Sequence, residues 1–246
     1  MQAGAIVRDA WQLYKAHWRT FVPLALVVYL ILGVVGLVLT LLLGWLGAIL
    51  SALIGIVGFF WLQGALVEAV QDVRDGRQDL SLGATFARVQ PRLPAIIPAG
   101  LIAGIAIAVC FVTIILIPLG LFLLTIWCLI VPVIVLEEKS AGESLGRSRE
   151  IVKGNGWSVF GVIVITIAAA LVANIILSIL LFWLPDAGEA FIRGVLSNTV
   201  VAPFIVVAWT LMYFALTQGR TAAPVSGEAY TAPPPPPPPS DSPTFP

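Results

Sequence analysis

The 246-residue chain is 59% apolar and only 11% charged, whereas about a quarter of the residues in an ordinary soluble domain carry a charge. This composition argues strongly against a water-soluble fold and indicates a membrane protein. The 13 Lys and Arg balance 13 Asp and Glu, so we expect no nucleic-acid partner. A single His and two Cys, both in apolar runs, are too few for a zinc cage or a Cys–His nucleophile pair, and we expect no cofactor, metal or enzymatic activity.

The chain opens with an amphipathic segment near residues 3–18. Ile6, Ala10 and Leu13 recur at helical spacing, with polar and charged residues between them. The spread of charge through this segment argues against a secretory signal, so we expect the first membrane span to be retained. The segment is therefore predicted to form a helix in the membrane interface.

Six apolar runs follow, each bounded by glycine, proline or charge. A helix needs about 20 predominantly apolar residues to cross the hydrocarbon core of a bilayer. We therefore predict an all-α membrane protein whose membrane domain, residues 1–217, is a six-helix transmembrane bundle. The predicted spans are 21–43, 46–70, 94–117, 119–136, 157–184 and 191–217.

Two more amphipathic helices are predicted, at 81–91 before the third span and at 141–153 before the fifth. The second of these begins with a capping box, in which Ser140 and Glu143 satisfy free amides of the helix start. Together with the first segment, the pattern favours a three-fold internal repeat. The alternative is that any interfacial helix carries Lys or Arg at this height.

Five basic residues on the second and third amphipathic helices are candidate contacts for anionic lipid headgroups. The alternative is that these charges only fix the topology. Of the 13 basic residues, 12 lie in connections on one side of the predicted spans, so both termini are expected in the cytoplasm. The candidate lipid contacts are Arg88, Arg92, Arg147, Arg149 and Lys153.

Small residues recur at four-residue spacing in the second and third spans, a pattern typical of closely packed helices. The alternative, that they line a pore, has no charged residue nearby to support it. Asn174 and Asn198 are expected at similar depth, where we predict that they bond to each other. The small residues are Gly47, Ser51, Gly55, Gly100, Gly104 and Ala108.

The segment Gly142–Gly146 matches the G-x-S-x-G motif of serine hydrolases letter for letter. That motif requires a preceding strand and a His base, whereas here a membrane span precedes it and the only His is His17. The motif is therefore interpreted as part of an amphipathic helix.

Residues 218–246 change composition completely and are predicted to form a proline-rich, disordered cytoplasmic tail. Seven consecutive prolines at 233–239 favour a stiff polyproline II rod, which is a ligand for aromatic grooves of a cytoplasmic partner. The alternative is a solvated linker that binds nothing.

The order of Pro132, Glu137, Leu-x-Arg-Ser at 145–148, Gly154 and Trp157 resembles the membrane domain attached to some bacterial glycerophosphoryl diester phosphodiesterases, and its stand-alone relatives. The resemblance covers residues 1 to about 217. It implies a multi-pass module of the bacterial inner membrane without a settled activity. It does not imply the phosphodiesterase reaction, because the paired His and acidic metal ligands of that catalytic domain are absent.

These observations favour a non-enzymatic inner-membrane protein that acts as a lipid-contacting scaffold or accessory subunit. Membrane lipids are the expected partners, together with other membrane proteins. The alternative is a permease or channel subunit for an uncharged or lipid-like solute. A continuous polar cavity reaching Asn174 and Asn198 would favour transport, whereas a dry bundle packed by Gly and Ala would favour the scaffold.

Overall fold

The computed structural model describes residues 2–76, 81–180, 182 and 186–217. Within these ranges, six helical segments are long and apolar enough to span a membrane, which confirms a multi-pass membrane protein. The predicted tail, 218–246, lies outside the described residues. The helices are α1 (Ala3–Ala16), α2 (Trp18–Leu43), α3 (Trp45–Arg74), α4 (Leu82–Val89), 3-10 helix η1 (Gln90–Arg92), α5 (Leu93–Val112), 3-10 helix η2 (Ile114–Leu116), α6 (Ile117–Trp127), α7 (Ile130–Glu137), α8 (Ala141–Val152), α9 (Gly156–Leu180) and α10 (Asp186–Thr217).

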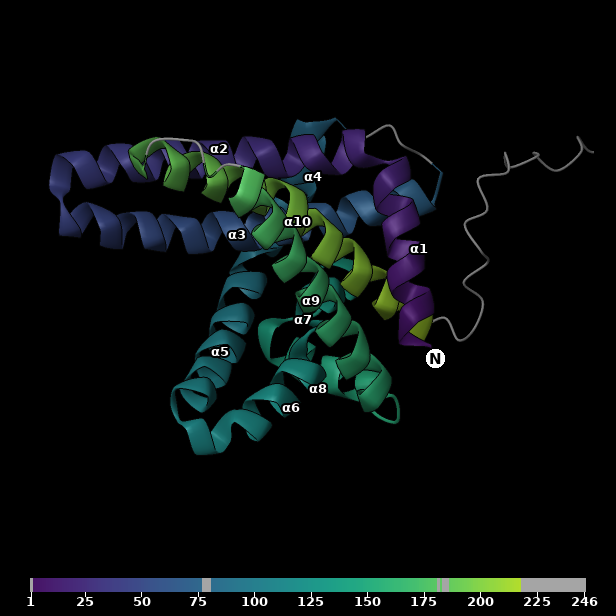
Figure 1. Ribbon diagram of the computed structural model, residues 1–246. Coiled ribbons are helices and arrows are strands. Elements are labelled where there is room, and N and C mark those ends of the chain that lie inside the picture. Colours follow the sequence, from purple (N-terminus) through teal and green to yellow (C-terminus); the bar gives the residue numbers. More distant parts are fainter. Residues whose placement is uncertain (1, 77–80, 181, 183–185, 218–246) are drawn as a thin grey trace, which may run out of the picture.

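Helices α2 and α3 form a long hairpin that projects from the rest of the protein as an arm (Figure 1). The turn is made by Gly44, whose φ of 58° lies in a region that only glycine adopts readily. Close approach of the two helices requires Gly47, because a Cβ there would collide with the carbonyl of Leu39. Ser51 packs beside Gly36 of the facing helix. The predicted packing face is therefore found at this end of the hairpin.

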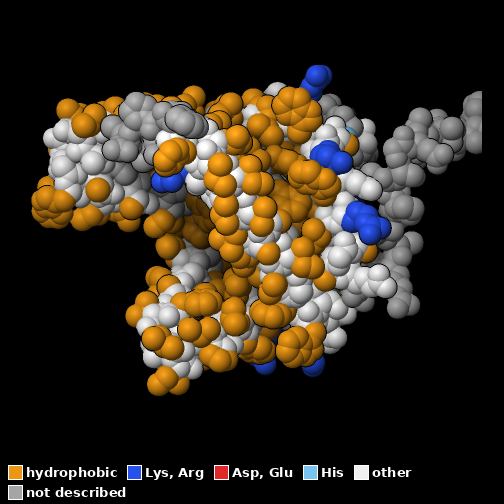
Figure 2. Space-filling view, viewed as in Figure 1, with side chains coloured by type: hydrophobic (Ala, Val, Ile, Leu, Met, Phe, Trp, Pro, Cys, Tyr) orange, Lys and Arg blue, Asp and Glu red, His pale blue; other side chains and the backbone are white. Residues whose placement is uncertain are grey.

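The arm diverges from α5, and an apolar groove of about 520 Å³ lies between α3 and α5. Figure 2 shows hydrophobic side chains over much of the visible face and a notch between the arm and the neighbouring pair α5 and α6. Gly100 fits against the ring of Phe60, whereas a Cβ added at Gly55 or Gly104 would meet no atom of a facing helix within 4 Å. The other half of the predicted small-residue face thus lines an open groove instead of a helix contact.

The predicted fourth span is broken into α6 and α7. Pro132 has no N–H and would disrupt a continuous helix, but it is tolerated in the first turn of α7 because no helix bond is required there. The break frees backbone carbonyls inside the protein, and each needs a donor. The hydroxyl of Ser148 in α8 donates to the carbonyl of Ile126 at 2.7 Å, and the Cys128 thiol donates to that of Thr125 at 3.3 Å.

Short helices occur at all three predicted amphipathic segments, but their partners differ. The apolar face of α1 packs against α9 and α10, and the hydroxyl of Tyr14 donates to the carbonyl of Val200 at 3.1 Å. Helix α4 packs mainly on α3, and α8 packs on α5, α6 and α7. The order of short helix and span therefore recurs three times without a common packing arrangement. The location of these helices in a membrane interface stays a prediction.

The buried face of α8 differs in part from the face that helical spacing predicts through Leu145, Ser148 and Ile151. Ser148 is buried as predicted, but Leu145 and Ile151 are only half-buried, and Ser144 and Val152 are buried instead. Ser148 faces inward because its hydroxyl satisfies a carbonyl at the break before α7, whereas the hydroxyl of Ser144 donates to a carbonyl of its own helix.

The predicted bond between Asn174 and Asn198 is wrong. The side-chain oxygen of Asn174 accepts a hydrogen bond from the buried hydroxyl of Ser197. Asn198 instead donates to the carbonyl of Gly194 in its own helix at 2.8 Å. Helices α9 and α10 are indeed neighbours at this depth, but the rotation of α10 turns Ser197 toward α9 and leaves Asn198 exposed.

We expect Ser148→Ala to destabilise the protein by about 1–3 kcal/mol, because it leaves a buried carbonyl without its donor. Thermal unfolding in detergent measures the loss. The matched control is Ser178→Ala, whose hydroxyl donates to a carbonyl within its own helix. Equal losses in both variants would contradict the assigned role of Ser148.

Candidate functional site

Charged residues gather where α3, α7 and α10 end, together with α4, η1 and α8; we call this region the charged end. The guanidinium of Arg74, the last residue of α3, lies 3.9 Å from the ring centre of Phe214 in α10. The hydroxyl of Tyr213 in α10 donates to Glu137 of α7 at 2.9 Å. The second, fourth and sixth spans thus end together, which explains why the connecting segments rich in charge converge.

Two consecutive carboxylates at the end of α7 organise the charged end. Glu137 is the last residue of the helix, and Glu138 adopts the left-handed conformation with φ of 54°. This conformation is uncommon for a residue other than glycine. Its effect is to end the helix so that the two carboxylates have different partners, Arg147 for Glu137 and Arg92 for Glu138.

Arg92 joins α3 to α7. Its guanidinium pairs with Glu68 of α3 through one nitrogen and with Glu138 at 2.8 Å through the other. The Glu68 side chain is only 8% exposed, so its charge would be costly without a partner. Arg92 stands at the end of η1, and this short 3-10 segment aims its side chain at α3 and α7.

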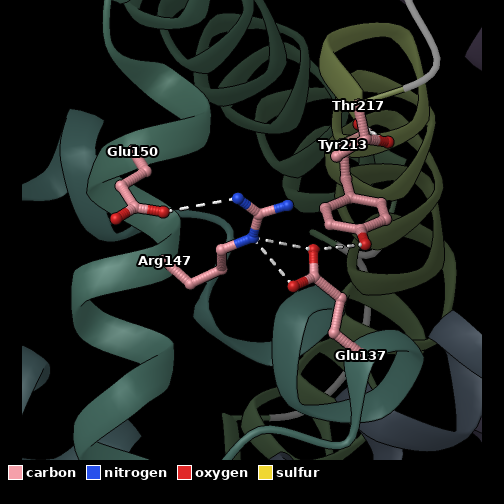
Figure 3. A network of polar contacts seen from close by, with 5 residues as sticks. All are labelled: Glu137, Arg147, Glu150, Tyr213 and Thr217. Atoms are coloured by element: carbon pink, nitrogen blue, oxygen red, sulfur yellow. Dashed lines mark hydrogen bonds and ion pairs between the residues drawn. The ribbon is translucent and has the colours of Figure 1, made fainter.

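Arg147 joins α8 to α7 and α10 through a second network, shown in Figure 3. Its Nε donates to the two carboxylate oxygens of Glu137 at 2.8 and 3.2 Å, and its Nη1 donates to Glu150 at 3.3 Å. The hydrogen bond to Glu137 is the main reason why the pKa of Arg147 is raised above its ordinary value. Glu137 therefore accepts bonds from Arg147 and Tyr213 together.

A polar cavity of about 390 Å³ opens beside the first network. Asp72 is 9% exposed, lines the cavity, and forms no ion pair or hydrogen bond with the residues that the structure describes. Arg88 is exposed at the same cavity and likewise has no ion pair within the described ranges. The lining residues are Glu68, Gln71, Asp72, Asp75, Arg88, Arg92, Val135, Leu136 and Glu138.

The five predicted lipid contacts therefore occupy two kinds of position. Arg92 and Arg147 are engaged by carboxylates of the protein itself. Arg88, Arg149 and Lys153 are exposed on α4, on α8 and just after α8. The structure brings the first two into one assembly around α7. Arg88 is exposed where it lines the polar cavity, and Arg149 and Lys153 do not line that cavity.

The acidic half of this site was not predicted from the sequence. Glu68 lies two residues before the end of a predicted span, so run length alone does not mark it as a polar residue of the bundle. A usable signal was present: Glu68 and Asp72 are four residues apart, which places both on one face of α3, and Asp75 follows on the same side. Charged residues sharing one face at the end of an apolar helix indicate a buried polar contact.

Comparison with protein-family models, curated proteins and solved structures finds no match to this chain. The resemblance to a phosphodiesterase-associated membrane domain stays a prediction. Across the described ranges, no group of three or more His, Cys, Asp or Glu is arranged to hold a metal ion.

We expect Arg147→Gln to lower the stability of the protein by about 1–2 kcal/mol. The side chain is 40% exposed, so solvent screening keeps the loss below that of a fully buried pair. Arg149→Gln is the matched control, because Arg149 is exposed two residues away on the same helix. Thermal unfolding in detergent compares them, and a control that loses as much as the variant would refute the role of the network.

The capping box of α8 predicts a specific pH dependence. Hydrogen bonds from Ser140 lower the pKa of Glu143 below its ordinary value of 4.5. Because the folded pKa is depressed, the stabilisation is complete above the unfolded pKa and is lost as the pH falls through the folded one. Ser140→Ala should therefore lower the melting temperature at pH 7, and the difference from wild type should shrink below pH 4.5. A difference that grows on acidification would contradict this assignment.

Proposed function

We propose that the protein is a non-enzymatic integral protein of the bacterial inner membrane that contacts lipids as a scaffold or accessory subunit. The observation that carries this proposal is the position of α8. Its inner face is fixed to the bundle by Ser148 and Arg147, while Arg149 and Lys153 stay exposed. Exposed bases beside membrane spans attract anionic lipid headgroups, at about 1 kcal/mol for each charge near the surface.

An apolar groove beside Lys153 supports lipid contact. The groove has a volume of about 590 Å³, lies between α6 and the start of α9, and includes Gly154, the residue after Lys153. Phe122 and Phe160 line it together with Trp157, which is 88% exposed. Exposed Trp is typical of the membrane–water interface. A base next to an aromatic groove suits a lipid whose headgroup binds Lys153 and whose acyl chain follows the groove.

Charge supports placing the charged end and both termini in the cytoplasm. Of the 13 basic residues, 12 fall in connections that the sequence assigns to the side where α3, α7 and α10 end, and Arg193 lies in α10 near the opposite side. The positive-inside rule favours a cytoplasmic location for the side rich in Lys and Arg. In this orientation the tail, 218–246, is available to a cytoplasmic protein that recognises polyproline.

We expect the double variant Arg149→Gln, Lys153→Gln to retain less phosphatidylglycerol than wild type. Native mass spectrometry of protein extracted from vesicles with equal phosphatidylglycerol and phosphatidylcholine counts the retained lipids. The control is Arg8→Gln, Lys15→Gln, which removes the same charges from α1. Equal losses in the two double variants would indicate general attraction by positive charge and would contradict a lipid site at α8.

The second candidate is a permease or channel subunit for an uncharged or lipid-like solute. The polar cavity at the charged end favours it, because a transport path needs polar groups within the bundle. A third groove, of about 720 Å³, contains Asn174, but it shares no lining residue with the polar cavity. This separation supports the scaffold over a continuous path. Solute flux into proteoliposomes, compared with empty vesicles, tests the second candidate directly.

A further inference from the structure

The polar cavity holds charges that have no ion pair among the described residues. Arg92 pairs with both Glu68 and Glu138. Asp72 and Arg88 line the same space without an ion pair to any described residue, and Asp75 adds a further negative charge at its edge. Burial of a carboxylate is unfavourable unless it meets a positive charge or hydrogen-bond donors. Among the described residues nothing supplies either to Asp72, so this carboxylate is available to a ligand.

The charges limit the chemistry of that ligand. A simple anion is disfavoured, because four carboxylates and only two guanidinium groups line the cavity. A simple cation would leave Arg88 without a partner. A carboxylate only accepts hydrogen bonds and a guanidinium only donates them, so the cavity suits a ligand with both an N–H cation and an anionic oxygen group. Its volume of about 390 Å³ lies within the range typical of small-molecule sites.

We infer that this cavity binds a zwitterionic headgroup that carries a phosphate and a primary ammonium, that of phosphatidylethanolamine. This inference rests on the proposed lipid-contacting function and adds a second site with a different selectivity. The ammonium binds Asp72, which is 9% exposed, and the phosphate binds Arg88 at the exposed side. The glycerol and acyl chains then leave the cavity on the side of Arg88.

The geometry predicts selectivity for a primary ammonium over a trimethylammonium. Phosphatidylcholine carries the same charges but has no N–H to donate to Asp72. Charged hydrogen bonds contribute enough to expect about a tenfold preference for phosphatidylethanolamine over phosphatidylcholine with the same acyl chains. Removing the charge of Asp72 should remove that preference.

The test is competitive lipid binding to the full-length protein, measured by native mass spectrometry. Wild type, Asp72→Asn and Arg88→Gln are each extracted from vesicles with equal amounts of the two lipids. We expect the tenfold preference in wild type, no preference in Asp72→Asn, and weaker binding of both lipids in Arg88→Gln. Asp9→Asn and Arg8→Gln on α1 are the matched controls and should behave as wild type.

Two outcomes would overturn the inference: equal retention of both lipids by wild type, or an unchanged preference in Asp72→Asn. If Asp72→Asn does not fold, Asp75→Asn at the exposed edge of the cavity takes its place, and the preference should then fall in part. Soluble glycerophosphoethanolamine is added as a competitor to distinguish a lipid headgroup from the free compound. Displacement of the lipid would identify the soluble compound as a ligand of the same site.

The proposed function can be refuted independently of the cavity site. It depends on retention of phosphatidylglycerol through Arg149 and Lys153, which do not line this cavity. If the protein prefers phosphatidylethanolamine but the α8 and α1 variants lose phosphatidylglycerol equally, the cavity site is supported and the α8 site is refuted. The opposite pattern supports the α8 site and refutes the cavity site.

Discussion

The pair of carboxylates at the end of α7 is the constraint on which the charged end depends. Glu138 is tied to Arg92 and through it to Glu68 of α3, whereas Glu137 is tied to Arg147 of α8 and Tyr213 of α10. One helix end thus connects elements that are distant in sequence. The Glu68 and Glu137 side chains are only 8% and 18% exposed. Removing a partner would therefore leave an unpaired carboxylate that is largely buried, which destabilises the fold.

The break between α6 and α7 determines where α8 lies. A continuous fourth span would satisfy its own carbonyls and would offer no bond to Ser148. The break supplies an acceptor at Ile126, and α8 packs over it with a hydroxyl face. Once that face is fixed, helical geometry turns Arg147 toward Glu137 and leaves Arg149 and Lys153 outside. A local backbone feature in the bundle therefore positions the bases that we assign to lipid contact.

Hydrophobic run length was sufficient to predict the six spans, because the bilayer imposes a minimum length on every crossing. The capping box at Ser140 was also predictable, since it depends on residues three apart in sequence. The rotation of α8 and the partner of Asn174 were not, because both depend on how one helix faces another. Run length alone does not reveal that the fourth span is broken before Pro132, which lies in the first turn of α7.

The acidic half of the site was harder to predict than the basic half. Arg and Lys outside the spans are conspicuous in so apolar a sequence, whereas Glu68 and Asp72 lie within or beside a predicted span. The pairing of Glu68 depends on η1, three residues that carry Arg92 to α3. Sequence alone therefore grouped Arg92 and Arg147 with Arg149 as equivalent bases, and the structure separates them by the carboxylates that they meet.

The most direct test of this account is a charge exchange across the link between α7 and α8. Glu137→Lys and Arg147→Glu are made singly and together, and thermal unfolding is measured in the same detergent. We expect each single variant to melt below wild type and the double variant to recover part of the loss, because the ion pair is restored with reversed polarity. A double variant whose loss equals the sum of the single losses would contradict the claim that this ion pair holds the charged end together.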